Sequence, residues 1–177
     1  MPSAQLALLR GINVGGKNIL PMRDLAVMFE EAGCENVRTF IQSGNVIFNS
    51  ASSVSRRLAG VVASRIEERF GYKAPVVLRT AQQLREVVSN NPFPHAEDIL
   101  HVMFLADLPD AAKSAALDPN RSSPDRFIVR GRDIYLHLPN GAAKTKLSNA
   151  WFDSKLSTVS TLRNWRTVTK LLAMMDA

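Results

Sequence analysis

Cysteine is almost absent from this sequence, since Cys34 is the only one among 177 residues. A single cysteine excludes an internal disulfide, the bond typical of small secreted proteins. No run of about 18 consecutive apolar residues occurs, so we expect no membrane-spanning helix and no membrane partner. The N-terminus lacks a basic start followed by an apolar stretch, so we expect no secretory signal. These absences together predict a cytoplasmic protein.

Patterns for metal binding and for common catalytic chemistry are also missing. The three histidines, His95, His101 and His137, are scattered, and none has the spacing of a zinc site with Cys34. Aromatic residues make up only 7% of the chain and no RNP-type aromatic motif is present, which argues against sequence-specific reading of RNA. We predict no metal and no cofactor. The sequence leaves open whether the protein is an enzyme.

What is present is the composition of a globular protein with a modest excess of positive charge. Hydrophobic residues make up 46% and charged residues 21%, and the net charge is +6. The segment from residue 139 onward holds six basic residues against Asp153 and Asp176, so it supplies four of the six excess charges. This distribution fits an anionic partner, and it equally fits a solvated helical surface.

Apolar periodicity and turn residues predict the order βαββαβ in the first part of the chain. The predicted elements are a strand at 5–10, a helix from Pro21 to a stop at Gly33, strands at 37–42 and 45–48 around Ser43-Gly44, a helix at 54–70 and a strand at 75–79.

A similar order, βαββα, is predicted for the rest of the chain, without obvious residue identity to the first. The elements are a helix at 81–89, a strand at 100–106, a helix at 110–117, strands at 126–130 and 133–138, and helices at 144–155 and 164–175. The predicted fold class is therefore α+β, with two ferredoxin-like βαββ-containing units packed together and extra C-terminal helices. The units span residues 1–79 and 80–177, and they could behave as one compact domain.

This topology predicts that two loops of the first unit are neighbours. In a βαββ unit with a right-handed crossover, the first and second strands run parallel. The loop that leaves the first strand and the hairpin between the second and third strands then lie at the same end of the sheet. Residues 10–18 and 42–45 are therefore expected to lie side by side.

The first of these loops is rich in glycine and carries two cations. Its candidate ligand-binding residues are Arg10, Gly11, Asn13, Gly15, Gly16, Lys17 and Asn18. The spacing Gly-x4-Gly-Lys resembles a P-loop, but Asn18 stands where Mg²⁺ needs a hydroxyl, and Pro21 delays the helix. Glycines still let backbone N–H groups approach an anion. The alternative is that they only shape a tight strand-to-helix connection.

The second loop offers the polar side chains Gln42, Ser43 and Asn45. Two amides and a hydroxyl suit hydrogen bonding to a planar or polyhydroxylated ligand. The alternative is plain turn chemistry, because Ser, Gly and Asn are preferred turn residues.

A third set of candidates, Lys146, Arg163 and Asn164, lies in the basic C-terminal part. Arg163 and Asn164 could recognise an anion or an amide, and they could equally cap the last helix and pair with a neighbouring loop. Trp165 shares a helical face with Val168 and Met175, so we expect it to anchor a core.

Several segments resemble a bacterial family catalogued as domain of unknown function 1697. They are residues 8–18 (Leu-Leu-Arg-Gly-Ile-Asn-Val-Gly-Gly-Lys-Asn), 41–46 (Ile-Gln-Ser-Gly-Asn-Val), 91–94 (Asn-Pro-Phe-Pro) and 161–165 (Thr-Leu-Arg-Asn-Trp). The resemblance covers essentially the whole chain. It implies a duplicated ferredoxin-like α+β fold and no established activity. Ala142, Ala143 and Thr145 replace a segment that often reads Gly-Arg-Ser in relatives, so any site in that loop is weaker here.

Three functions remain compatible with the sequence. The favoured one is a binding module for a phosphate-bearing or otherwise anionic ligand, a nucleic acid or nucleotide, at the glycine loop. The second is a small-molecule enzyme with a pocket between residues 10–18 and 42–45. The third is a protein-interaction scaffold that uses its basic C-terminal part.

Overall fold

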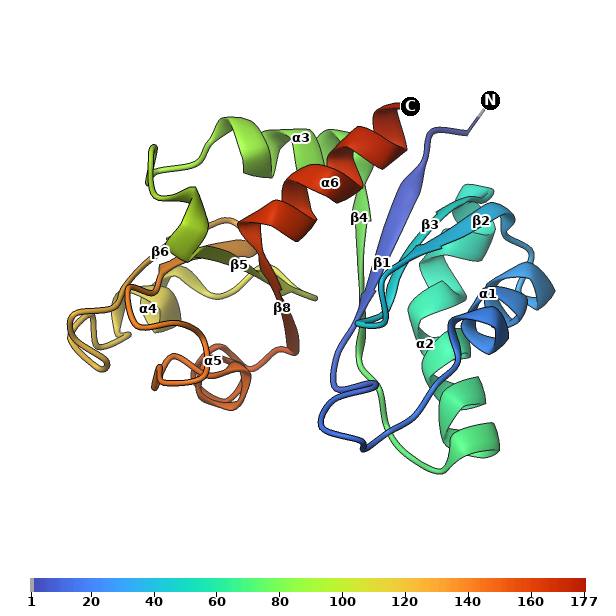
Figure 1. The fold of residues 1–177 in the computed structure, drawn as a ribbon, viewed down its shortest axis with the longest axis horizontal. Coiled ribbons are helices and arrows are strands. Elements are labelled where there is room, and N and C mark those ends of the chain that lie inside the picture. Colours follow the sequence, from blue (N-terminus) through green and yellow to red (C-terminus); the bar gives the residue numbers. More distant parts are fainter. Residues whose placement is uncertain (1) are drawn as a thin grey trace. The chain divides into compact units, whose positions relative to one another are not determined.

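Two four-stranded antiparallel sheets organise the chain, one in each of two compact units (Figure 1). The structure is a computed structural model, and it describes residues 2–177. The first unit contains the chain up to Leu84 together with Leu171–Ala177, and the second contains Arg85–Lys170. This division rests on contacts between residues, whereas the predicted division at 79/80 separates repeats along the sequence.

The first unit has the predicted order βαββαβ. Its elements are β1 (Gln5–Leu9), α1 (Met22–Glu31), β2 (Glu35–Phe40), β3 (Asn45–Asn49), α2 (Ser52–Phe70) and β4 (Val76–Thr80). The strand order is β2-β3-β1-β4. Because β1 and β2 are each antiparallel to β3, they run in the same direction, as the topology predicted.

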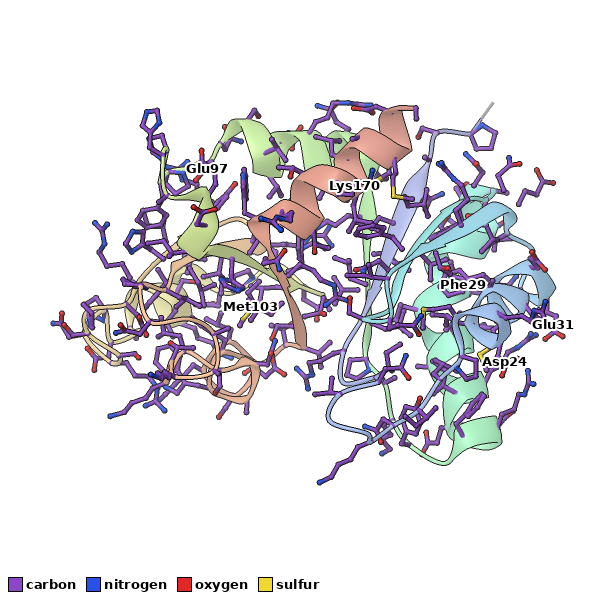
Figure 2. All side chains as sticks on the ribbon, viewed as in Figure 1. Asp24, Phe29, Glu31, Glu97, Met103 and Lys170 are labelled. Carbon is purple, nitrogen blue, oxygen red and sulfur yellow. The ribbon has the colours of Figure 1, made fainter. Side chains whose placement is uncertain are left out.

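The core of the first unit lies between this sheet and the two helices α1 and α2. Ala7 and Leu9 of the central strand contribute the sheet side of the core, and both are fully buried. Phe29 of α1 (Figure 2) packs with its ring centroid 5.4 Å from that of Phe48 on β3. The apolar residues of α1 and α2 recur at helical spacing because one face of each helix packs on the sheet.

The second unit repeats this arrangement. Its elements, including those shared with the first unit, are α3 (Ala81–Ser89), η1 (Glu97–Ile99), β5 (Leu100–Leu105), α4 (Ala111–Ala115), β6 (Arg126–Arg130), β7 (Asp133–His137), α5 (Asn149–Leu156), β8 (Ser160–Asn164) and α6 (Trp165–Asp176). The strand order β6-β7-β5-β8 matches that of the first sheet. Met103, Ile134 and Phe152 belong to its core. The fold class is thus confirmed as a duplicated ferredoxin-like α+β fold.

The duplication extends to the register of the strands. Leu6 of β1 lies opposite Arg79 of β4, and Val102 of β5 lies opposite Arg163 of β8. Each arginine follows a leucine, is more than nine-tenths buried, and donates to that leucine's carbonyl, at 2.9 Å for Arg79 and 2.8 Å for Arg163. Both repeats therefore contain a Leu-Arg pair at the same position before a helix, a similarity that was not predicted from the sequence.

Three local predictions were wrong. Strand β8 was missed because its five residues include a buried arginine and show no apolar run. The helix expected at 144–155 begins only at Asn149, since Ser148 caps it by accepting from the N–H of Trp151. The strand expected at 37–42 ends at Phe40, because Ile41 adopts a positive φ of 50°.

None of the helices that the structure describes is both long enough and apolar enough to cross a membrane.

Replacement of Gly44 by alanine tests the closest approach in the first unit. A Cβ on Gly44 would lie 2.8 Å from Cβ of Leu9 and 2.9 Å from Cδ1 of Ile12, and the residue has a φ of +85°. We expect Gly44→Ala to lower the free energy of unfolding by roughly 2–5 kcal/mol in urea titrations. Gly71→Ala is the matched control. Gly71 has a φ of +79° but no atom within 4 Å of a built Cβ, so its loss should be about 1–2 kcal/mol. Equal losses in the two variants would contradict the steric explanation.

Candidate functional site

The glycine loop that follows β1 is a small hairpin. Val14 and Lys17 form an antiparallel bridge, in which the N–H of Lys17 donates to the carbonyl of Val14 at 3.0 Å. The turn residues Gly15 and Gly16 have φ values of 57° and 74°. Positive φ at both central residues is the type I′ pattern, which favours glycine. The two glycines are therefore needed for the turn itself.

Open space surrounds the end of this hairpin. Gly15 and Gly16 are exposed, and a Cβ built on either of them would meet no atom within 4 Å. Within residues 2–177, their backbone N–H groups have no hydrogen-bond acceptor. A ligand could therefore approach the backbone at this turn closely.

Asn13 holds the base of the hairpin with its side-chain amide. Its Nδ2 donates to the carbonyl of Leu20 at 2.9 Å and to that of Gln42 at 2.8 Å, and its Oδ1 accepts from the N–H of Leu20 at 2.8 Å. Both amide protons are thus used inside the protein. Asn18 makes a similar internal bond, from Nδ2 to the carbonyl of Gly11 at 2.8 Å. These two asparagines, predicted as ligand-binding residues, position the loop.

The turn between β2 and β3 is held in the same way. Asn45 is fully buried, and its Nδ2 donates to the carbonyl of Phe40 and to Oγ of Ser43, both at 2.9 Å. Gln42 has an exposed side chain, whereas Ser43 is half-buried. Of the polar side chains predicted here, Gln42 is the most accessible.

The predicted proximity of the two loops is confirmed. The bond from Asn13 to the carbonyl of Gln42 joins them, and the N–H of Leu9 donates to the carbonyl of Gly44 at 2.9 Å. The close approach of Gly44 to Leu9 and Ile12 is a further contact between the loops.

A third segment, residues 71–76, also reaches this end of the sheet. The N–H of Arg10 donates to the carbonyl of Pro75 at 3.0 Å, and the hydroxyl of Tyr72 donates to the carbonyl of Ile19 at 3.3 Å. Burial raises the pKa of the Tyr72 hydroxyl, which keeps it a donor. The sequence reading missed this segment. The topology could have predicted it, because the start of β4 lies beside the end of β1 when the two strands are antiparallel.

We call these three segments, residues 10–20, 41–45 and 71–76, the basic tip. They contain Arg10, Lys17 and Lys73 and no Asp or Glu. Lys17 and Lys73 are exposed, whereas Arg10 is half-buried. These segments therefore carry cations without carboxylates, a set of charges that suits an anion.

The candidates predicted in the C-terminal part occupy different environments. Lys146 is exposed, and its backbone N–H donates to Oγ of Ser122 at 2.9 Å. Arg163 is only 7% exposed, and burial lowers the pKa of its guanidinium to about 10. Asn164 caps α6, since its Oδ1 accepts from the N–H of Thr167 at 2.8 Å. The capping alternative is confirmed for Asn164, and so is the burial of Trp165 at 7% exposure.

Cys34 is buried, whereas His101 and His137 are half-buried and His95 is exposed. Burial raises the pKa of the Cys34 thiol to about 11, so it is not a thiolate at neutral pH. Burial also lowers the pKa of His101, opposed by a hydrogen bond involving Ile99, so its imidazole is neutral at pH 7. Within the described residues, no group of three or more His, Cys, Asp or Glu side chains could hold a metal ion.

Asn13→Asp tests the bond that joins the two loops. Aspartate keeps the acceptor for Leu20 but loses both donors, and its charge faces two carbonyl oxygens. We expect the free energy of unfolding to fall by roughly 2–4 kcal/mol in urea titrations. Asn36→Asp is the control, because Asn36 has the same φ of 52° but makes only one exposed bond, to Asn49. Its loss should stay below about 1 kcal/mol; a larger loss there would argue against a special role for Asn13.

Ile41→Asn tests the backbone strain in the β2–β3 turn. Ile41 is 50% exposed and has a φ of 50°, a conformation that disfavours β-branched side chains and that asparagine tolerates. We expect the variant to be more stable than the wild type by about 1 kcal/mol, seen as a higher thermal midpoint. Ile19→Asn is the control, because Ile19 is similarly exposed but is not among the residues with positive φ. A gain of the same size in the control would exclude strain as the cause.

Comparison with known proteins agrees with this fold. The chain is similar to a solved structure, that of the conserved bacterial protein SP0830 from Streptococcus pneumoniae, with a TM-score of 0.78, 21% sequence identity and 100% of each chain covered. No curated protein matches it. The family described as "Protein of unknown function (DUF1697)" matches residues 3–135, which is well over half of the sequence. The chain therefore belongs to the DUF1697 family.

Proposed function

We propose that this protein is a binding module for a phosphate-bearing ligand, nucleic acid or nucleotide, which it holds at the basic tip. One observation carries the proposal. Hydrogen bonds join three segments that are distant in sequence, and these segments together contain three cations and no acidic residue. Lysine side chains and exposed backbone N–H groups are the usual ligands of phosphate.

The parts of the tip have separate roles in this proposal. Lys17 and Lys73 supply charge that is accessible to solvent. The N–H groups of Gly15 and Gly16 supply neutral donors, and the exposed amide of Gln42 can bond a sugar or a base edge. Asn13 and Asn45 act indirectly, because their amides fix the positions of the two loops. The proposed site does not include Lys146, Arg163 and Asn164, which belong to the second unit.

We also propose a cytoplasmic location. A nucleic-acid or nucleotide ligand and a single reduced cysteine both suit the cytoplasm.

The salt dependence of binding to a labelled oligonucleotide tests this function. Each lysine that neutralises a phosphate releases a counterion, so affinity falls as salt rises. We expect Lys17→Ala to reduce the slope of log affinity against log salt by about 0.7–0.9 and to weaken binding about fivefold near physiological salt. Fluorescence anisotropy at several salt concentrations measures both quantities.

Lys144→Ala is the matched control, since Lys144 is also exposed and its loss changes the net charge equally. Its binding should stay within about twofold of the wild type. An equal loss in both variants would mean that net charge alone attracts the ligand. A wild-type protein without salt-sensitive binding to oligonucleotides or nucleotides would overturn the proposal.

A further inference from the structure

Exposed aliphatic side chains gather at the basic tip. Val14 is 65% exposed, Ile19 57% and Ile41 50%, and each comes from a segment of the tip. In the part of the chain that the structure describes, the other large exposed apolar residues, Val27, Leu108 and Val159, lie elsewhere. Single exposed aliphatic residues are ordinary, but three in segments that hydrogen bonds hold together point to a contact site.

Ile41, one of these three residues, has a strained backbone conformation. Ile41 holds a β-branched side chain in the left-handed region and exposes half of it to water. Asparagine or glycine would occupy this backbone without strain. Strained residues of this kind cluster at binding sites, and half of the Ile41 side chain is open to solvent.

One aliphatic side chain of the tip lies beside one of its cations. Val14 and Lys17 are paired across the hairpin bridge, and residues paired in this way point to the same face. A ligand that meets the cation therefore also meets the aliphatic side chain. Free phosphate and inorganic polyphosphate have no apolar part to place there.

We infer that the ligand of the basic tip is a single-stranded nucleic acid, with its phosphates at Lys17, Lys73 and the Gly15-Gly16 turn and its bases against Val14, Ile19 and Ile41. This inference rests on the proposed function and narrows its ligand. A single strand presents phosphates beside base faces, and the tip pairs the cation Lys17 with the aliphatic Val14. In a duplex the base faces are stacked on one another, so only the phosphates would be recognised. Aliphatic contact with a base face makes no hydrogen bond to the base edge, so it does not read sequence, in keeping with the absence of an RNP-type motif.

Fluorescence anisotropy of a labelled 12-nucleotide single strand, with its duplex as a second ligand, tests this inference. We expect Val14→Ser and Ile19→Ser each to weaken single-strand binding by about fivefold, because each removes an apolar contact. Their salt slopes should equal that of the wild type, since no charge is lost. Val27→Ser is the control, because Val27 is an exposed valine of α1 in the same unit, outside the tip. It should bind within about twofold of the wild type.

Ile41→Asn distinguishes loss of a ligand contact from damage to the fold, because a damaged fold would lower both affinity and stability. The variant should bind the single strand about fivefold more weakly than the wild type while its thermal midpoint rises. Loss of affinity together with a gain of stability separates a contact role from a structural one. A variant that is more stable and binds equally well would overturn the role of Ile41.

The remaining outcomes separate this inference from the function on which it rests. The inference fails, while anion binding stands, if the serine variants bind normally and one of two further results is found. Either the duplex binds as tightly as the single strand, or polyphosphate competes with the single strand equally well per phosphate. If Lys17→Ala also leaves all binding unchanged, the proposed function fails. If the tip binds vesicles of anionic phospholipid but no oligonucleotide, and Val14→Ser abolishes this, the partner is a membrane surface and the inference is wrong.

Discussion

The absence of a side chain at Gly44 is the constraint on which the candidate site depends. Only glycine allows the β2–β3 turn to approach Leu9 and Ile12 so closely, and only then can the N–H of Leu9 reach the carbonyl of Gly44. Once the turn is in place, Asn13 can bond to the carbonyl of Gln42. Segments about 30 residues apart in sequence are thus held as one surface by backbone geometry and a single amide.

Much of the fold followed from the sequence because burial imposes periodic patterns. The apolar spacing in α1 and α2 and the turn residues around Gly44 were sufficient to predict the unit, and the unit's topology predicted that two loops would meet. The failures have local causes. Strand β8 contains the buried Arg163, which interrupts any apolar pattern, and the early end of β2 comes from an isoleucine in a conformation that its residue type disfavours.

The site itself was less predictable than the scaffold. Asn13 looks like a ligand residue in the sequence, because an amide in a glycine-rich loop can bond either to a ligand or to nearby backbone groups. Only the positions of Leu20 and Gln42 show that its bonding capacity is used internally. Lys73 was overlooked because it belongs to no motif, and its significance comes from the hydrogen bonds of its neighbours Tyr72 and Pro75.

Duplication has preserved the strand register of the two units but not the chemistry of their loops. The register places Asn45 of the first unit where the second has Asp133. After the first strand, Arg10 and Gly11 continue the chain in one unit, whereas Ala106 and Asp107 do so in the other. The repeated sheet is therefore a scaffold, and function has to be argued from the loops of each copy separately.

The Gly15-Gly16 turn gives the hairpin an end that the rest of the unit does not constrain. No atom lies within 4 Å of a Cβ built on either residue, so extra residues could be accommodated at this point without displacing the core. Lengthening or shortening the hairpin would change how far the tip extends while the bonds of Asn13 keep its base in place.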